Sequence, residues 1–177
     1  MTRIVYFDLE TQKLAEEVGG WHNIRRMGLA AAVIYSTADE QYHDYTEENV
    51  EELIAALRAA DLVVGFNLLR FDYEVLRAYT DDPLDDLPTV DMLVHLTRAL
   101  GHRVSLDQVA SATLGETKSA DGVQAVYWYR QGLIEKVLDY CRQDVAVTKA
   151  VYEFGKTHGY VRFRDRRWRI RRVPVRW

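Results

Sequence analysis

The chain has 177 residues, of which 48% are apolar and 28% charged, the composition of an ordinary soluble globular protein. This length suits one domain with a hydrophobic core. The sequence has no run of about 18 apolar residues, so we expect no membrane span, and residues 1–10 lack the segments of a signal peptide. The single cysteine, Cys141, cannot form an internal disulfide, so a cytoplasmic location is expected.

Charge is distributed unevenly along the chain, whose net charge is −4. Of the 23 basic and 27 acidic side chains, eight arginines and one acid, Asp165, lie in residues 161–177, which leaves 15 basic and 26 acidic elsewhere. An acidic body is unusual in a protein that binds nucleic acid unless some of its acids hold cations. A basic segment on such a body is a candidate contact for phosphates.

Three strands are predicted in the first part of the chain. Runs of β-branched, aromatic and other apolar residues indicate strands over residues 3–10, 27–36 and 41–45. The polar stretch 12–26 predicts a loop or a short helix. Three successive strands with tight connections are typical of an antiparallel meander.

A crossover unit follows these strands. Thr46 is the predicted N-cap of an amphipathic helix over residues 47–59, whose apolar residues recur at helical spacing. Residues 61–66 are a predicted buried strand, and a strand, a helix and a second strand in succession imply a parallel crossover. A helix over 71–79 and a short strand over 88–91 come next.

The rest of the chain is mostly helical. Helices are predicted over residues 92–100, 105–114, 122–131 and 133–157, and the alternation of Arg with aromatic and β-branched residues over 160–177 predicts a hairpin. The complete order is that of an α/β protein with a mixed sheet, which several folds share.

Asp8 and Glu10 lie two residues apart on the first predicted strand. Because side chains alternate between the faces of a strand, both carboxylates leave the same face. Two like charges so close repel each other, and a cation such as Mg²⁺, which prefers carboxylate oxygens, relieves the repulsion. Surface strands also carry such pairs, but Tyr6, Phe7 and Leu9 indicate a buried strand, where carboxylates need a partner.

Asn67 and Asp72 follow the apolar strand 61–66. They lie at its carboxyl end, where open α/β sheets place their sites. They also lie at the start of the next helix, so Asp72 has the alternative role of a helix cap.

Tyr140 and Asp144 lie four residues apart, on one face of the helix 133–157. A phenol and a carboxylate aimed together can hold a water between a metal and an incoming phosphate. The alternative is an aromatic core residue beside a solvated acid.

Three segments carry a resemblance to a known family: FDLET (7–11), NLLRFD (67–72) and YCRQD (140–144). In this order they resemble the three exonuclease motifs of the DEDD superfamily, and the Tyr-x-x-x-Asp form of the third resembles the tyrosine (DEDDy) subclass. The chain from residue 3 to 154 is similar to stand-alone or helicase-linked ribonuclease H-like domains described as predicted exonucleases.

The resemblance implies a ribonuclease H-like fold: a mixed sheet of three antiparallel strands plus parallel strands, flanked by helices. It implies a 3′→5′ exonuclease that releases nucleoside 5′-monophosphates by a two-metal mechanism, with Mg²⁺ or Mn²⁺ as the cations. Tyr140 would position the attacking water, and Asn67 and the backbone of Thr11 would touch the terminal nucleotide. The implied metal ligands are Asp8, Glu10, Asp72 and Asp144.

Other functions and partners stay open on the sequence. The same fold would serve a metal-dependent endonuclease or junction-cleaving enzyme, or a nucleic-acid-binding module without catalysis. The expected substrate is nucleic acid with single-stranded 3′ ends, and a helicase or another repair or RNA-processing protein is a candidate partner. Residues 1–157 are the expected exonuclease domain, with 158–177 a basic hairpin or tail of the same domain.

Four further features have two interpretations each. Asp91 is a helix cap or a secondary acid near the site, and Trp21 packs in the core or stacks on a base. Lys118 is a loop residue or a phosphate contact. The basic hairpin binds the phosphates and bases of a strand, or it neutralises the acidic body and packs as edge strands, where arginines discourage association between sheets.

Overall fold

The computed structural model describes residues 2–115 and 121–177, and the predicted phosphate contact Lys118 lies outside these residues. A five-stranded sheet has the order β3-β2-β1-β4-β5. Its pairing is antiparallel on the β1–β2–β3 side and parallel on the β1–β4–β5 side. The strands are β1 (Ile4–Thr11), β2 (Leu29–Ser36), β3 (Gln41–Tyr45), β4 (Leu62–Gly65) and β5 (Thr89–Asp91).

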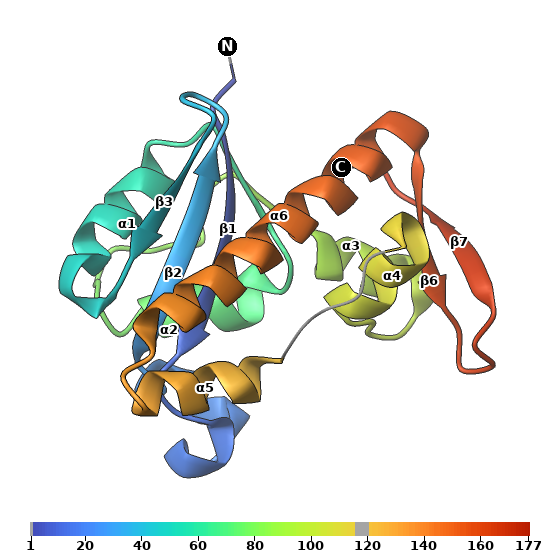
Figure 1. The fold of residues 1–177 in the computed structure, drawn as a ribbon. Coiled ribbons are helices and arrows are strands. Elements are labelled where there is room, and N and C mark those ends of the chain that lie inside the picture. Colours follow the sequence, from blue (N-terminus) through green and yellow to red (C-terminus); the bar gives the residue numbers. More distant parts are fainter. Residues whose placement is uncertain (1, 116–120) are drawn as a thin grey trace.

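Helices cover both faces of this sheet. α1 (Val50–Arg58) and α2 (Tyr73–Leu76) cover one face, and the long helix α6 (Ile134–His158) runs across the other towards the C-terminal hairpin (Figure 1). On the side of α6 lie also α3 (Met92–Leu100), α4 (Leu106–Leu114) and α5 (Gly122–Arg130). The predicted α/β fold, a mixed sheet of antiparallel and parallel strands flanked by helices, is therefore confirmed.

Alternation along β1 divides the core into two clusters. Val5, Phe7 and Leu9 are buried against α1 and α2, whereas Tyr6 is buried against α6. Burial of each such large apolar side chain contributes about 1.5–3 kcal/mol. Asp8 and Glu10 have the parity of Tyr6, so strand geometry directs both acids to the side of α6.

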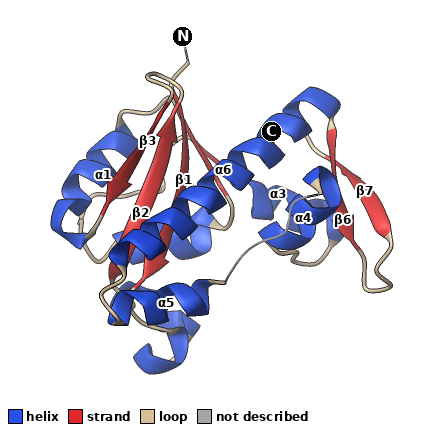
Figure 2. Ribbon diagram, in the orientation of Figure 1, coloured by secondary structure: helices blue, strands red, loops and turns tan. Residues whose placement is uncertain are grey.

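The C-terminal segment forms a hairpin apart from the main sheet. β6 (Tyr160–Arg164) and β7 (Ile170–Pro174) make a separate two-stranded sheet beside α4 (Figure 2). The predicted hairpin is confirmed, and its buried residues pack into the cluster that α3, α4 and α6 form. The Thr113 hydroxyl of α4 accepts from the Arg162 N–H at 2.9 Å and donates to the Arg162 carbonyl at 3.0 Å.

Element boundaries depart from the predictions at two places. The predicted helix 47–59 begins with a 3-10 turn, Glu47–Asn49, before α1. The predicted helix 71–79 is a π-helical turn, Leu68–Asp72, followed by the four residues of α2. The π turn begins after Asn67, whose left-handed backbone (φ 72°) is outside the helical region.

No helix within the described residues 2–115 and 121–177 is long and apolar enough to cross a membrane.

Candidate active site

Three acidic side chains converge at one end of the main sheet. Asp8 and Glu10 come from β1 and Asp144 comes from α6, and one carboxylate oxygen of each lies within 4.8 Å of the other two. Glu10 and Asp144 are buried and Asp8 is half-buried. We call these three residues the acidic cluster, which contains three of the four predicted metal ligands.

The packing of α6 on β1 sets this arrangement. Asp8 and Glu10 leave the face of β1 that α6 covers, and α6 presents Tyr140 and Asp144 one turn apart. The register between β1 and β2 shifts at a bulge between Glu10 and Thr11. Bulges re-aim side chains and are common beside active sites, and this bulge directly follows the second acid of the cluster.

The acidic cluster has the chemistry of a divalent-cation site. Two unit charges 4–5 Å apart repel by about 3–4 kcal/mol at an effective dielectric constant of about 20. Burial adds the cost of removing each carboxylate from water. Carboxylate oxygens are the donors that hard cations such as Mg²⁺ and Mn²⁺ prefer, so the donor set fits such a cation.

Asp72 lies beside the acidic cluster and is tied to β1. Its carboxylate accepts a hydrogen bond of 3.1 Å from the backbone N–H of Leu9, and its side chain is buried. Burial raises the pKa of Asp72 well above its ordinary value, and the charge of Asp8 raises it further. The side chain makes no capping hydrogen bond at α2, so the helix-cap interpretation of Asp72 is wrong.

Tyr140 and Cys141 complete the α6 side of the site. Tyr140 is buried, and its ring meets Trp128 of α5 edge to face at 6.2 Å. The Cys141 thiol donates to the carbonyl oxygen of Asp8 at 3.2 Å. Burial raises the pKa of this thiol, and the neighbouring carboxylates raise it further. Cys141 therefore joins α6 to β1 at the acid as a neutral thiol.

A cleft of about 620 Å³ opens beside the acidic cluster. The acids, Thr11 and Tyr140 line it, and two 3-10 helices, η1 (Ala15–Val18) and η2 (Trp21–Arg26), contribute the facing wall with α5. Within this wall, an ion pair between Glu17 and Arg130 joins η1 to α5. The cleft volume is that of an ordinary ligand pocket.

Trp21 borders the cleft on its outer side. Its side chain is 69% exposed, and its ring centroid lies 6.2 Å from that of Phe71, which also lines the cleft. The expectation that Trp21 packs in the core is therefore wrong. An exposed indole beside a cleft can stack on a planar ligand.

Asn67 lies outside this cleft, on an adjoining groove lined also by Trp21, Arg70 and Phe71. Its side-chain oxygen accepts from Arg103 at 3.1 Å. Asn67 follows Gly65 closely, where a Cβ would meet the side chain of the buried Leu68 at 2.5 Å.

Both the sequence and the fold of the chain are similar to those of known proteins. Residues 5–154 match the RNase H superfamily. The chain belongs to the RNase H superfamily. No curated protein shows significant sequence similarity to the chain.

Among solved structures, the chain is similar to the family B DNA polymerase from the hyperthermophilic archaeon Pyrobaculum calidifontis, with a TM-score of 0.67 and 16% sequence identity. The similarity covers 88% of this chain and 24% of the polymerase chain, so it concerns the fold of a portion of that protein. Membership of the RNase H superfamily and this fold support nuclease activity on nucleic acid.

In this RNase H superfamily chain, the structure places most predicted site residues at one cleft. Asp72 is buried against β1 behind it, and Asn67 lies on the adjoining groove. The residues that line the cleft together are Asp8, Glu10, Thr11, Tyr140 and Asp144.

Two contributions to the site were missed at the level of sequence. The contact of Cys141 with Asp8 joins residues 133 positions apart, although Cys141 lies one turn before Asp144 on the same helix. Asp91 caps α3 as predicted, through the N–H of Leu93, and it also accepts from the N–H groups of Asn67 and Leu69. Its place as the last residue of β5, which is parallel to β4, is the signal that would have found this second role.

Proposed function

We propose that the chain is a metal-dependent 3′→5′ exonuclease of the tyrosine subclass of the DEDD superfamily. The observation that carries the proposal is the acidic cluster of Asp8, Glu10 and Asp144 at a cleft that Tyr140 also lines. The motif resemblance supports the direction of cleavage, and the RNase H superfamily membership supports the class of reaction.

The four acids have the role of holding two divalent cations, Mg²⁺ or Mn²⁺. Asp8, Glu10 and Asp144 offer oxygens that are already close together, and Asp72 lies on the neighbouring backbone. When bound, such cations activate water and neutralise charge on the phosphate and the departing 3′-oxygen. The protein contributes a preformed set of donors on a central strand and a packed helix, which limits reorganisation during the reaction.

Tyr140 has the role of orienting the attacking water. Its ring is buried and meets Trp128 edge to face, and its side chain lines the cleft. A phenol does not act as a base near neutral pH, because its ordinary pKa is about 10. Hydrolysis therefore depends on the acids and their cations, and we expect no covalent enzyme intermediate.

The terminal nucleotide fits the space between the acidic cluster and Trp21. Thr11, Trp21 and Phe71 all line the cleft together with the acidic cluster. Base stacking on an aromatic side chain contributes about 1–3 kcal/mol and tolerates any base. Asn67 would touch the nucleotide from the adjoining groove, beside Phe71.

Residues 1–157 would form the exonuclease domain, with 158–177 part of the same unit. A cytoplasmic location and a helicase, repair or RNA-processing partner remain predictions.

The test is hydrolysis of single strands labelled at the 5′ end, as DNA and as RNA, with Mg²⁺, Mn²⁺ or a chelator. The proposal predicts a metal-dependent ladder that shortens from the 3′ end, release of 5′-monophosphates, and a block by a 3′-terminal phosphorothioate. Internal fragments that survive the block would instead show an endonuclease. Binding of the strand without degradation in Mg²⁺ would show a non-catalytic module.

A further inference from the structure

The C-terminal hairpin has two different faces. Cross-strand partners share a face of the hairpin. Val161 pairs with Val173 on the inner face, and Arg162 pairs with Arg172 on the outer face. The inner face is buried with Val161, Phe163 and Val173 against the helices. The outer face carries an aromatic residue and cations: Tyr160, Arg162, Arg164 and Arg172, with Ile170 beside them.

Two arginines of the outer face lie close together, and both contact the same aromatic ring. Arg162 and Arg172 are directly opposite, and like charges in that position destabilise a strand pair. Their guanidinium carbons lie 5.5 Å and 4.4 Å from the centroid of the Tyr160 ring. Cation–π contact with one shared ring holds both groups in place at the surface. The hairpin thus presents two neighbouring, oriented guanidinium groups to solvent.

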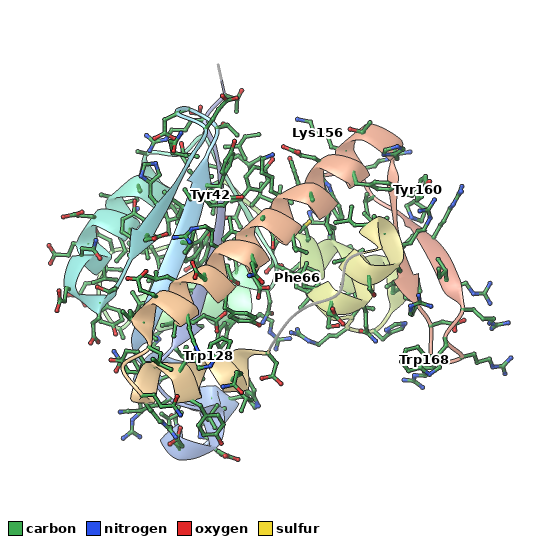
Figure 3. The ribbon with its side chains drawn as sticks, viewed as in Figure 1. Tyr42, Phe66, Trp128, Lys156, Tyr160 and Trp168 are labelled. Atoms are coloured by element: carbon green, nitrogen blue, oxygen red, sulfur yellow. The ribbon has the colours of Figure 1, made fainter. Side chains whose placement is uncertain are left out.

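The turn of the hairpin is ordered by one acid. Asp165 accepts from the backbone N–H groups of Arg167 and Arg169 and forms ion pairs with the side chains of Arg169 and Arg171. These contacts leave Trp168 at the tip of the hairpin, where its side chain is 79% exposed (Figure 3). Its backbone is left-handed (φ 59°), a conformation that is uncommon for a bulky side chain.

Among the described residues, the hairpin forms no ion pair with the acidic body. Within residues 2–115 and 121–177, the ion pairs of its arginines are those with Asp165, which is itself part of the hairpin. Six of the eight arginines take no part in an ion pair among the described residues: Arg162, Arg164, Arg166, Arg167, Arg172 and Arg176. Their charge is therefore available to an anionic ligand.

We propose that this hairpin is a second nucleic-acid contact, which binds the single strand upstream of the end held in the cleft. Guanidinium groups in pairs match the oxygens of successive phosphates. An exposed indole at the tip matches an unpaired base, which a duplex does not offer. An acidic protein or an anionic membrane would satisfy the arginines alone and gain nothing from base stacking. The role as a strand contact rests on the proposed exonuclease function.

The position of the hairpin defines which substrates depend on it. β6 follows α6 directly, and α6 also carries Asp144 of the acidic cluster. The 14 helical positions from Asp144 to His158 correspond to about 21 Å along the axis. A strand must therefore be several nucleotides long to occupy the cleft and the hairpin together, and shorter substrates do not depend on the hairpin.

Binding is tested with the full chain in chelator, so that no cleavage occurs, on a fluorescein-labelled oligothymidine several tens of nucleotides long. We expect Arg162→Gln/Arg172→Gln to weaken binding about tenfold and to reduce the slope of log K against log salt by about 1.4, for two phosphate contacts. Trp168→Ala is expected to weaken binding by a similar factor. The charge-keeping Arg162→Lys/Arg172→Lys should retain the salt slope.

A matched control removes the same charge elsewhere: Lys136→Gln/Arg58→Gln, outside the hairpin and the cleft. Thermal unfolding of each variant shows whether it is folded. Unchanged binding in the folded hairpin variants, or equal weakening by the control pair, would overturn the proposal. The proposal would also be overturned if the hairpin variants lost as much affinity for anionic vesicles or for polyglutamate as they lose for oligothymidine.

Activity separates this proposal from the exonuclease function. In Mg²⁺, the hairpin variants should raise KM on the long strand while kcat and the hydrolysis of a trinucleotide stay unchanged. A chain that binds through the hairpin but hydrolyses nothing would refute the exonuclease function and leave the binding role. If the chain hydrolyses both substrates and the hairpin variants have an unaltered KM, the exonuclease function stands and the binding role of the hairpin is refuted.

Discussion

The acidic cleft and the basic hairpin are opposite in charge and in burial. The acidic cluster is held on a central strand and a long helix, with Glu10 and Asp144 buried. The hairpin has an apolar inner face, and its arginines are half-buried or exposed. Both regions concentrate like charges, but in the cleft they lie where water is scarce and in the hairpin they lie at the surface.

This difference in burial affects how strongly each region interacts with its ligand. Buried acids at close range have strong interactions with a cation, because the local dielectric constant is low, and that is the requirement of catalysis. Exposed arginines have weak individual interactions that salt screens, which suits a strand that must bind and move on. On this basis we propose that the cleft carries the chemistry and that the hairpin supplies affinity for long strands.

The largest expected effect is in the cleft. Asp144→Asn should lower the rate of hydrolysis by about a thousandfold or more, because it removes one ligand from the acidic cluster. Its stability in chelator should be equal to or above that of the wild type, because one repulsive charge is removed. The matched control is Asp139→Asn, an exposed acid on the same helix that pairs with Arg142. Initial rates and thermal unfolding give both quantities, and equal rates for the two variants would break the comparison.

The second prediction concerns Asp72, which has two roles that substitution can separate. Asp72→Asn keeps an oxygen for the N–H of Leu9, whereas Asp72→Ala leaves that buried N–H without its acceptor. The free energy of unfolding of Asp72→Ala should therefore be lower than that of Asp72→Asn by about 1–3 kcal/mol. Both variants should lose activity. Urea unfolding measures the difference, and equal stabilities would contradict the structural role.

The third prediction loosens the hairpin without changing its charge. Thr113→Val removes the hydroxyl that bonds both the N–H and the carbonyl of Arg162, and should cost about 1–3 kcal/mol. The control is Thr97→Val, because the buried hydroxyl of Thr97 has no hydrogen-bond partner among the described residues. That change should be neutral or stabilising. Hydrogen exchange should show faster opening of the hairpin in Thr113→Val alone, while trinucleotide hydrolysis stays unchanged.

The smallest expected effect is the pH dependence of the hairpin turn. A hydrogen bond from the Arg169 backbone, together with those from Arg167 and Arg171, lowers the pKa of Asp165 from 3.8 to about 2. Because the folded-state pKa of Asp165 is below its ordinary value, the ionised carboxylate stabilises the folded turn. This stabilisation is complete above about pH 4 and is lost as the pH falls towards 2. NMR shifts of the Trp168 indole should follow that change. In Asp165→Asn the indole should show no transition in this range.

Much of the fold follows from local patterns in the sequence. The apolar runs and their period placed all five strands of the main sheet and the helix that carries Tyr140 and Asp144, because burial of one face imposes that period. Strand parity was enough to place Asp8 and Glu10 on one face. The predicted helix 71–79 departs from this pattern, because the segment begins earlier as a π-helical turn and ends at Leu76.

The remaining parts of the site depend on long-range contacts. Asp72 bonds to a residue 63 positions earlier, and Cys141 bonds to one 133 positions earlier. No local pattern distinguishes such an acid from a helix cap, or such a cysteine from a core residue. The packing of the hairpin on α4, apart from the main sheet, likewise depends on Thr113 and on an inner face whose partner is distant in the chain.

The central claim is that the acidic cluster is a divalent-cation site. The most direct measurement is calorimetric titration of Mn²⁺ into the wild type, Asp8→Asn and the control Asp139→Asn, with thermal unfolding in the same buffers. We predict binding to the wild type and the control, with a rise in Tm of about 5–10 °C at saturating metal, and loss of both in Asp8→Asn. Equal Mn²⁺ binding by Asp8→Asn and the wild type, or no binding by the wild type, would contradict the claim.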